Sequence, residues 1–137
     1  MERFLGQFSP YLYAVMRIVV GFLFACHGAQ KLFGVLGGVG QPGEAAPLFS
    51  LMGLAGVIEF FGGLLIMVGW LTGYVAFIAS GQMAAAYFMA HHPRSFWPIE
   101  NNGEPEVLFC FILLYMASRG AGIWSIDSAR GQVRGPL

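Results

Sequence analysis

Four long apolar stretches, separated by short polar segments, restrict what this sequence can fold into. A helix needs about 20 apolar residues to cross the ~30 Å hydrocarbon core of a bilayer. The stretches cover roughly residues 11–33, 48–70, 72–91 and 105–124. Because their apolar residues run continuously, without strict alternation, they predict helices and not the strands of a membrane barrel.

The scarcity of charge supports the same interpretation. Only 10% of the residues are charged and 57% are hydrophobic, whereas soluble domains average about 25% charged residues. Seven basic residues balance seven acidic ones, so the chain has no general attraction for nucleic acid. The sequence therefore predicts an all-α fold, an integral membrane four-helix bundle that forms a single domain over residues 1–137.

The first stretch is expected to remain in the protein as a membrane helix. It is longer than the apolar core of a typical signal peptide, it contains Arg17, and no small-residue cleavage site follows it. This interpretation places four helices in the bilayer and both termini on one side.

The basic residues predict which side that is. Two lie on the side of the first and third loops, Lys31 and Arg94. Four lie on the side of the termini: Arg3, Arg119, Arg130 and Arg134. Because basic residues are enriched in cytoplasmic segments, both termini are expected in the cytoplasm.

Two charged residues, Arg17 and Glu59, lie well inside apolar stretches. A charge that faces lipid costs roughly 2.5–3.5 kcal/mol on insertion scales, so both side chains are expected to face the interior. They could form an ion pair, with each other or with Arg119, that only fixes the helix register. They could equally line a polar cavity that binds a ligand or transfers protons, because intramembrane charges are commonly functional.

Further polar residues gather near the outer ends of the stretches: His27, Lys31, Tyr87, His91, Glu104 and Glu106. Opposed histidines could ligate a haem, or a metal together with carboxylates, although no HxxxH or ExxH pair is present and we expect no metal site. The group could instead form a hydrogen-bonded polar mouth. As a third possibility, it could donate hydrogen bonds to the carbonyl groups of a quinone beside an apolar groove.

The two cysteines allow two interpretations. Cys26 and Cys110 lie in the first and fourth stretches at matching depth. They could be small apolar core residues, or they could form a redox-active or structural pair between two helices. The sequence has no P-loop, GxSxG, dinucleotide-binding or zinc motif that would indicate another chemistry.

Four strings, in order along nearly the whole chain, resemble the signatures of the DoxX family. They are RIVVGFLFACHGAQKLFG from Arg17, AGVIEFFGGLLIMVG from Ala55, ENNGEPEVLFC from Glu100 and GAGIWSID from Gly120. The resemblance implies a four-helix protein of the bacterial inner membrane. One departure is Ala121, where the family commonly has proline, and it concerns the terminal turn more than any site.

The resemblance also carries the family's signature positions onto this chain. In the first two strings these are Arg17, Gly21, His27, Gly28, Lys31, Glu59, Gly62 and Gly63. In the last two they are Asn102, Gly103, Glu106, Gly120, Gly122, Ser125 and Asp127.

The resemblance implies redox-linked work in the membrane. Relatives are linked to thiosulfate oxidation that feeds electrons to quinone, and to membrane complexes that act with superoxide dismutase and a sulfurtransferase. Because the chain has no motif for a redox cofactor, electrons would pass through a partner protein, a bound quinone or the two thiols.

The leading hypothesis is a small redox-linked membrane subunit, of the thiosulfate:quinone type if it is an enzyme, with a polar pocket accessible to quinone. Catalytic candidates are Glu59, His27 and Lys31. The expected ligand-binding set is Arg17, His27, Lys31, Glu59, Tyr87, His91, Glu104 and Glu106. The alternative is a non-enzymatic accessory subunit of a larger respiratory or photosynthetic complex. Both imply protein partners or a homo-oligomer within the bilayer, whereas a solute carrier is disfavoured because four short helices enclose little space.

Overall fold

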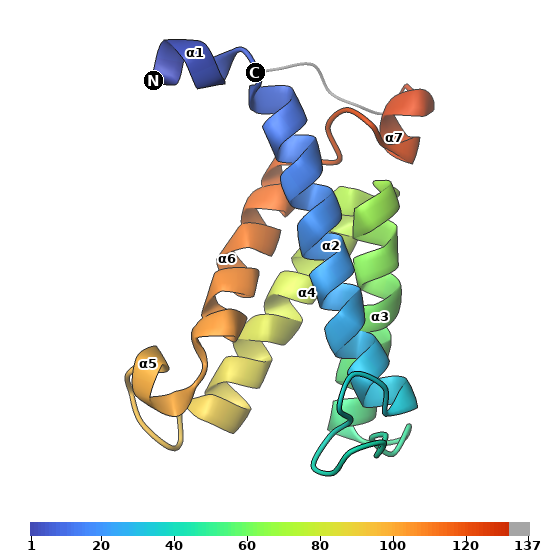
Figure 1. Ribbon diagram of the computed structural model, residues 1–137, viewed down its shortest axis with the longest axis vertical. Helices are drawn as coiled ribbons and strands as arrows, with labels where there is room; N and C mark the ends of the chain where they lie inside the picture. Colours follow the sequence, from blue (N-terminus) through green and yellow to red (C-terminus); the bar gives the residue numbers. More distant parts are fainter. Residues whose placement is uncertain (132–137) are drawn as a thin grey trace.

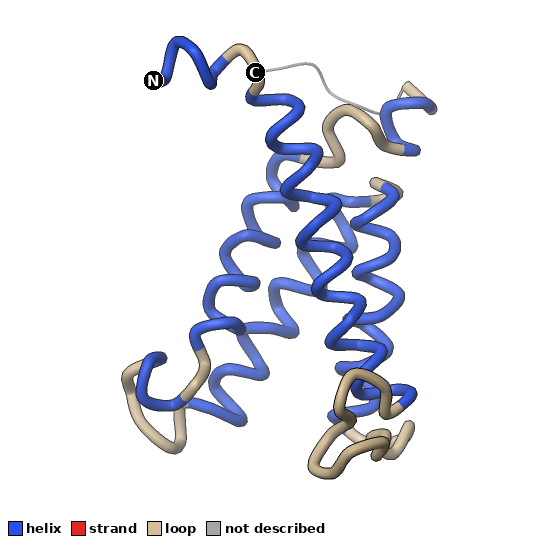
Figure 2. The backbone as a smooth tube through the Cα atoms, viewed as in Figure 1, coloured by secondary structure: helices blue, strands red, loops and turns tan. Residues whose placement is uncertain are grey.

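The computed structural model describes residues 1–131, and these residues form helices joined by loops, without a strand (Figure 2). A short helix at the N-terminus is followed by two long helices and then by two of intermediate length. The elements are α1 (Glu2–Gly6), α2 (Ser9–Phe33), α3 (Leu51–Val68), α4 (Thr72–Ala86), the π-helical turn η1 (Tyr87–His91), α5 (Pro98–Asn101), α6 (Glu104–Arg119) and α7 (Ile126–Ala129).

The long helices pack as two pairs. Helix α2 packs on α3, α4 packs on α6, and the two pairs meet where α3 contacts α4. Figure 1 shows α1, α7 and the start of α2 at one end of the molecule, which we call the termini end. The loop 34–50, η1 and α5 lie at the opposite end, which we call the loop end (Figure 1).

Glycines allow α2 and α3 to approach closely. A Cβ atom added to Gly21 would lie 2.6 Å from the Met67 backbone nitrogen, and one added to Gly63 would lie 2.6 Å from the Gly21 carbonyl oxygen. No real side chain fits at such distances, so the contact requires hydrogen at both positions. Small residues at helical spacing allow this kind of backbone approach between membrane helices.

The helix ends differ in part from the expected boundaries. Helix α3 begins at Leu51 and not near residue 48, because the Ser50 hydroxyl accepts a hydrogen bond from the Gly53 N–H at 3.0 Å and caps the helix. The expected helix 105–124 ends at Arg119, since Gly120 has a φ of +78°. Residues 72–91 are continuously helical, but the last turn is π-helical.

Apolar side chains fill the interior and also cover much of the outside. Phe24, Ile66 and Leu113 are fully buried within the core, whereas Phe61 is 54% and Phe111 is 66% exposed. Helices α2 and α3 are the two in residues 1–131 whose length and composition would allow them to cross a membrane. Residues 1–131 are therefore all-helical, with an outer surface unlike that of most soluble domains.

Candidate functional site

A buried ion pair lies toward the loop end, between α2 and α3. The Lys31 ammonium group donates to one carboxylate oxygen of Glu59. The Gln82 side-chain amide, from α4, donates to the other oxygen at 3.0 Å. Glu59 is only 1% exposed, so its charge is satisfied by these two side chains and not by bulk water.

Local sequence explains why the pair forms there. Glu59 lies one helical turn after Gly56 on the face of α3 that packs against α2. A Cβ atom on Gly56 would lie 3.0 Å from the Lys31 Cβ atom, so the missing side chain makes room for the lysine stem. Lys31 occupies the last turn of α2, where a positive charge interacts favourably with the helix dipole.

A small cavity of about 30 Å³ adjoins the ion pair. It is larger than the roughly 10–15 Å³ that one water molecule requires. Four of its lining side chains can carry charge: His27, Lys31, Glu59 and Glu106. The other four are apolar: Phe24, Met83, Pro105 and Phe109. His27 is the exposed one among the four that can carry charge.

Two oxygen atoms near this cavity are buried without a hydrogen-bond partner among residues 1–131. They are the Gln82 Oε1 atom and the Glu106 Oε2 atom. An unpaired buried acceptor costs about 1–3 kcal/mol. Water in the adjoining cavity could satisfy such acceptors, which fits the chemistry of its lining.

Glu106 also connects the cavity to the loop end. Its Oε1 atom lies 3.3 Å from the His91 Nε2 atom, and the other ring nitrogen, Nδ1, lies 2.9 Å from the Asn101 carbonyl oxygen. His91 ends the π-helical turn, which is closed by a 2.9 Å bond from the His92 N–H to the Tyr87 carbonyl oxygen. Such turns are often found at functional sites.

Four of the expected site residues lie outside the cavity lining: Arg17, Tyr87, His91 and Glu104. The Tyr87 hydroxyl donates to the Phe96 carbonyl oxygen at 3.0 Å and accepts from the Asn101 amide at 3.3 Å, so it braces the loop. Glu104 is exposed in the first turn of α6. His91 reaches the cavity only through Glu106.

Arg17 lies at the other end of the molecule and is not paired with Glu59, in contrast to one sequence expectation. Glu59 pairs with Lys31 and not with Arg119. Arg17 is fully buried. Its guanidinium group donates to the carbonyl oxygens of Ile66, Met67 and Trp124 at 2.7–2.8 Å, and to that of Ile123 at 3.3 Å. It therefore joins the end of α3 to the segment before α7, which is a structural role.

Sequence reasoning missed Gln82 and Asn101. Gln82 has a recognisable signal, because it is the one side-chain amide within the apolar stretch 72–91. Asn101 is 1% exposed and its amide donates to the Ser95 carbonyl oxygen at 2.8 Å. Its position in a polar loop gave no indication of burial.

The thiols, the potential metal ligands and the size of the small cavity limit which cofactors residues 1–131 could hold. Cys26 and Cys110 are free thiols, and no group of three or more potential metal ligands converges within residues 1–131. Ligand pockets for small organic molecules usually measure about 300–1,000 Å³. A cavity of about 30 Å³ therefore does not fit a quinone ring.

These features define a class: a small all-helical protein with apolar outer faces and a charged cluster between its helices. The DoxX family model matches residues 12–92, and the chain belongs to the DoxX family. It is also similar to an uncharacterized protein of Haemophilus influenzae, with 37% identity over 131 residues that cover 90% of this chain and 94% of that protein. No solved structure matches the chain significantly. Family membership and the two apolar helices indicate a small membrane protein.

Proposed function

We propose that this chain is a multi-pass protein of the bacterial inner membrane in which α2, α3, α4 with η1, and α6 all cross the bilayer. The exposed apolar side chains on the helices support this proposal. The 15 residues of α4 and the five of η1 give a continuous helix of about 30 Å. Helix α6 has 16 residues and a length of about 24 Å, a mismatch that local thinning of a bilayer accommodates.

The distribution of basic residues supports cytoplasmic termini. Arg3, Arg119 and Arg130 belong to α1, the end of α6 and the end of α7, all at the termini end (Figure 1). Arg134, the fourth basic residue expected there, lies outside the described residues. In this orientation the loop end, with Arg94 and most of the carboxylates, faces the periplasm.

Within that membrane protein, the cluster around Glu59 is the functional site, and its work is proton handling in a redox-linked complex. The single observation that carries this proposal is a carboxylate held between an ammonium group and an amide, beside a cavity large enough for water. Charged pairs inside a membrane are costly and commonly functional. Packing alone would be served as well by apolar side chains.

The arrangement provides a route for protons between the cavity and the loop end. Glu59 can exchange a proton with Lys31 or with cavity water, and Glu106 lines the same cavity while it contacts His91. A carboxylate and an imidazole in sequence are groups that relay protons. A quinone or sulfur compound would react outside this cavity, in the complex that the subunit serves, and the cluster would supply or remove its protons.

The test is thiosulfate-dependent quinone reduction by membranes that contain the protein. Glu59→Gln removes the ionisable group and keeps the size and shape of the side chain. The rate is expected to fall by about 100-fold, as when a general acid–base group is removed. Glu104→Gln is the matched control, because Glu104 is an exposed carboxylate outside the cavity, and it should retain the wild-type rate. Wild-type turnover in a fully assembled Glu59→Gln complex would contradict the proposal.

A second candidate function is a non-enzymatic accessory subunit that anchors a larger membrane complex. The small volume of the cavity and the extent of the exposed apolar faces favour it. This alternative predicts that Glu59→Gln leaves the turnover per assembled complex unchanged but lowers the amount of complex. Quantifying the proteins that co-purify with each variant, alongside the rate, separates the two functions.

A further inference from the structure

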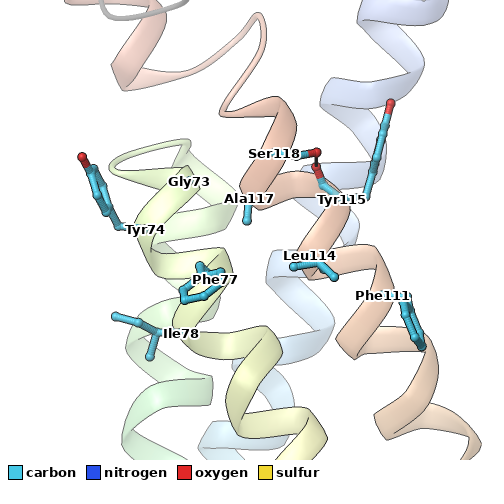
Figure 3. Close-up of a pocket in the computed structure, with 9 residues that line it drawn as sticks. All are labelled: Gly73, Tyr74, Phe77, Ile78, Phe111, Leu114, Tyr115, Ala117 and Ser118. Atoms are coloured by element: carbon cyan, nitrogen blue, oxygen red, sulfur yellow. Dashed lines mark hydrogen bonds between the residues drawn. The ribbon is translucent and has the colours of Figure 1, made fainter.

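A second, much larger hollow lies on the outside of the molecule, between α4 and α6. This groove has a volume of about 830 Å³. Its lining, drawn in Figure 3, consists of Gly73, Tyr74, Phe77, Ile78, Phe111, Leu114, Tyr115, Ala117 and Ser118. It is separate from the cluster around Glu59, because none of these residues lines the small cavity.

The lining of the groove is apolar along its length and polar at one end. Phe77 from α4 and Phe111 from α6 are each about two-thirds exposed, at 65% and 66%. The hydroxyl groups of Tyr74 and Tyr115 point toward the termini end (Figure 3). Ser118 lies at the same end, with its hydroxyl bonded to the Tyr115 carbonyl oxygen at 2.8 Å. An amphipathic occupant, with its polar group at that end, matches this gradient.

The charges near the polar end of the groove indicate the sign of the occupant's polar group. Arg119 directly follows Ser118 and packs over the Tyr13 ring at 5.6 Å. Arg130 packs over Trp70, just before α4, at 5.7 Å. Neither guanidinium group forms an ion pair within residues 1–131. Both arginines thus lie at the termini end, Arg119 next to Ser118 in the chain and Arg130 beside the turn that precedes α4.

No acidic residue within residues 1–131 forms an ion pair with these arginines. Asp127 lies at this end, but its two carboxylate oxygens accept hydrogen bonds from the Leu71 and Thr72 N–H groups at 3.1 and 3.2 Å. Most other carboxylates of the chain lie toward the loop end, at residues 44, 59, 100, 104 and 106. The molecule is therefore polarised, with unpaired positive charge where the groove begins.

We propose that the groove holds an acyl chain of an anionic phospholipid from the leaflet at the termini end, and that Arg119 and Arg130 bind its phosphate. This inference rests on the proposed membrane placement, which brings the termini end to the headgroup region. Anionic lipids favour juxtamembrane basic residues, and an apolar groove of this size accommodates a lipid chain. The arginines supply charge selectivity, and the groove supplies retention.

The experiment uses the full chain in nanodiscs of equal parts phosphatidylglycerol and phosphatidylcholine, followed by native mass spectrometry of the released protein. The wild type should retain phosphatidylglycerol in preference to phosphatidylcholine. Substitution of Arg119→Gln and Arg130→Gln together should lower that preference by about fivefold for each arginine. The lysine substitutions at both positions should keep it, and Arg94→Gln, at the loop end, should leave it unchanged.

A groove-filling variant tests the apolar part. Leu114→Trp should reduce retention of both lipids without changing their ratio. Equal retention of the two lipids by the wild type would overturn the proposal, as would retention that survives loss of both arginines. Two copies of the chain without bound phospholipid would assign the groove to a dimer contact and also overturn it. Failure to enter nanodiscs at all would instead reject the membrane placement, so the two failures are distinguishable.

Discussion

Glu59 and Lys31 hold opposite charges together in the part of the molecule where a charge is most costly. Each residue depends on the other, because removal of one partner leaves a desolvated charge without compensation. Replacement of both by uncharged side chains removes the charges together and avoids most of that penalty. The stability of the protein and the function of the pair can therefore be separated by single and double substitutions.

We predict that Glu59→Gln lowers the free energy of unfolding by about 2–3 kcal/mol. The double variant, which also carries Lys31→Met, should regain most of the lost stability. A value below the usual range of about 3–5 kcal/mol for buried pairs is expected because the Lys31 side chain is 17% exposed and partly solvated. Thermal unfolding of the single and double variants in detergent measures the effect. A double variant less stable than Glu59→Gln would show that the pair is held by more than charge compensation.

The site residues show what can and cannot be predicted at this scale. That Arg17 and Glu59 are buried follows from the sequence, since both lie within apolar stretches. The partners of Arg17 do not follow, because all four of its acceptors are backbone carbonyl groups, which leave no trace in the residue types. Gln82 was missed for a different reason: an uncharged amide in an apolar stretch costs less than a charge does, so its presence is a weaker signal of a buried site.

The contact between α2 and α3 is the tightest feature at the scale of elements. Gly21 lies against the backbone of α3, so an added methyl group would meet main-chain atoms that cannot rotate away. Gly81, in α4, is its natural control, because a Cβ atom there would meet nothing within 4 Å. The two glycines have the same chemistry and opposite surroundings.

Gly21→Ala is accordingly expected to lower the unfolding free energy by about 1–3 kcal/mol through overpacking. Gly81→Ala should raise it by about 0.5–1 kcal/mol, because alanine is the better helix former. The difference in Tm between the two variants is the measurement. Similar Tm values for both would mean that α2 and α3 separate readily, which the close packing does not permit.

The turn between α3 and α4 shows how a distant segment completes an element. Arg17 binds the carbonyl groups at the end of α3, while Asp127 accepts from the Leu71 and Thr72 N–H groups at the start of α4. These are the groups that a helix end leaves unsatisfied. The helices themselves could be predicted from apolar runs, but their ends could not, because the capping groups come from residues about 55 positions away.

At the scale of the whole molecule, the main question is how many helices cross the bilayer. Helices α2 and α3 satisfy the requirements of length and composition by themselves. The shorter pair, α4 and α6, has strongly apolar outer faces but less length. A protein with two crossings would keep the loop between η1 and α6 on the side of the termini, whereas four crossings place this loop on the opposite side.

This difference allows a direct test by cysteine labelling. In a variant with Cys26→Ala and Cys110→Ala, a single cysteine at Arg94 reports on the loop before α5, where that residue is exposed. Four crossings predict that a membrane-impermeant maleimide added to intact spheroplasts labels this position. Gln41→Cys, in the exposed first loop, should be labelled with either number of crossings, and Gln7→Cys, near the exposed N-terminus, should be protected until the membrane is broken. Protection at Arg94→Cys together with labelling at Gln41→Cys would establish two crossings, and it would contradict the proposed route, because His91 and the Glu59 cluster would then lie on opposite sides of the bilayer.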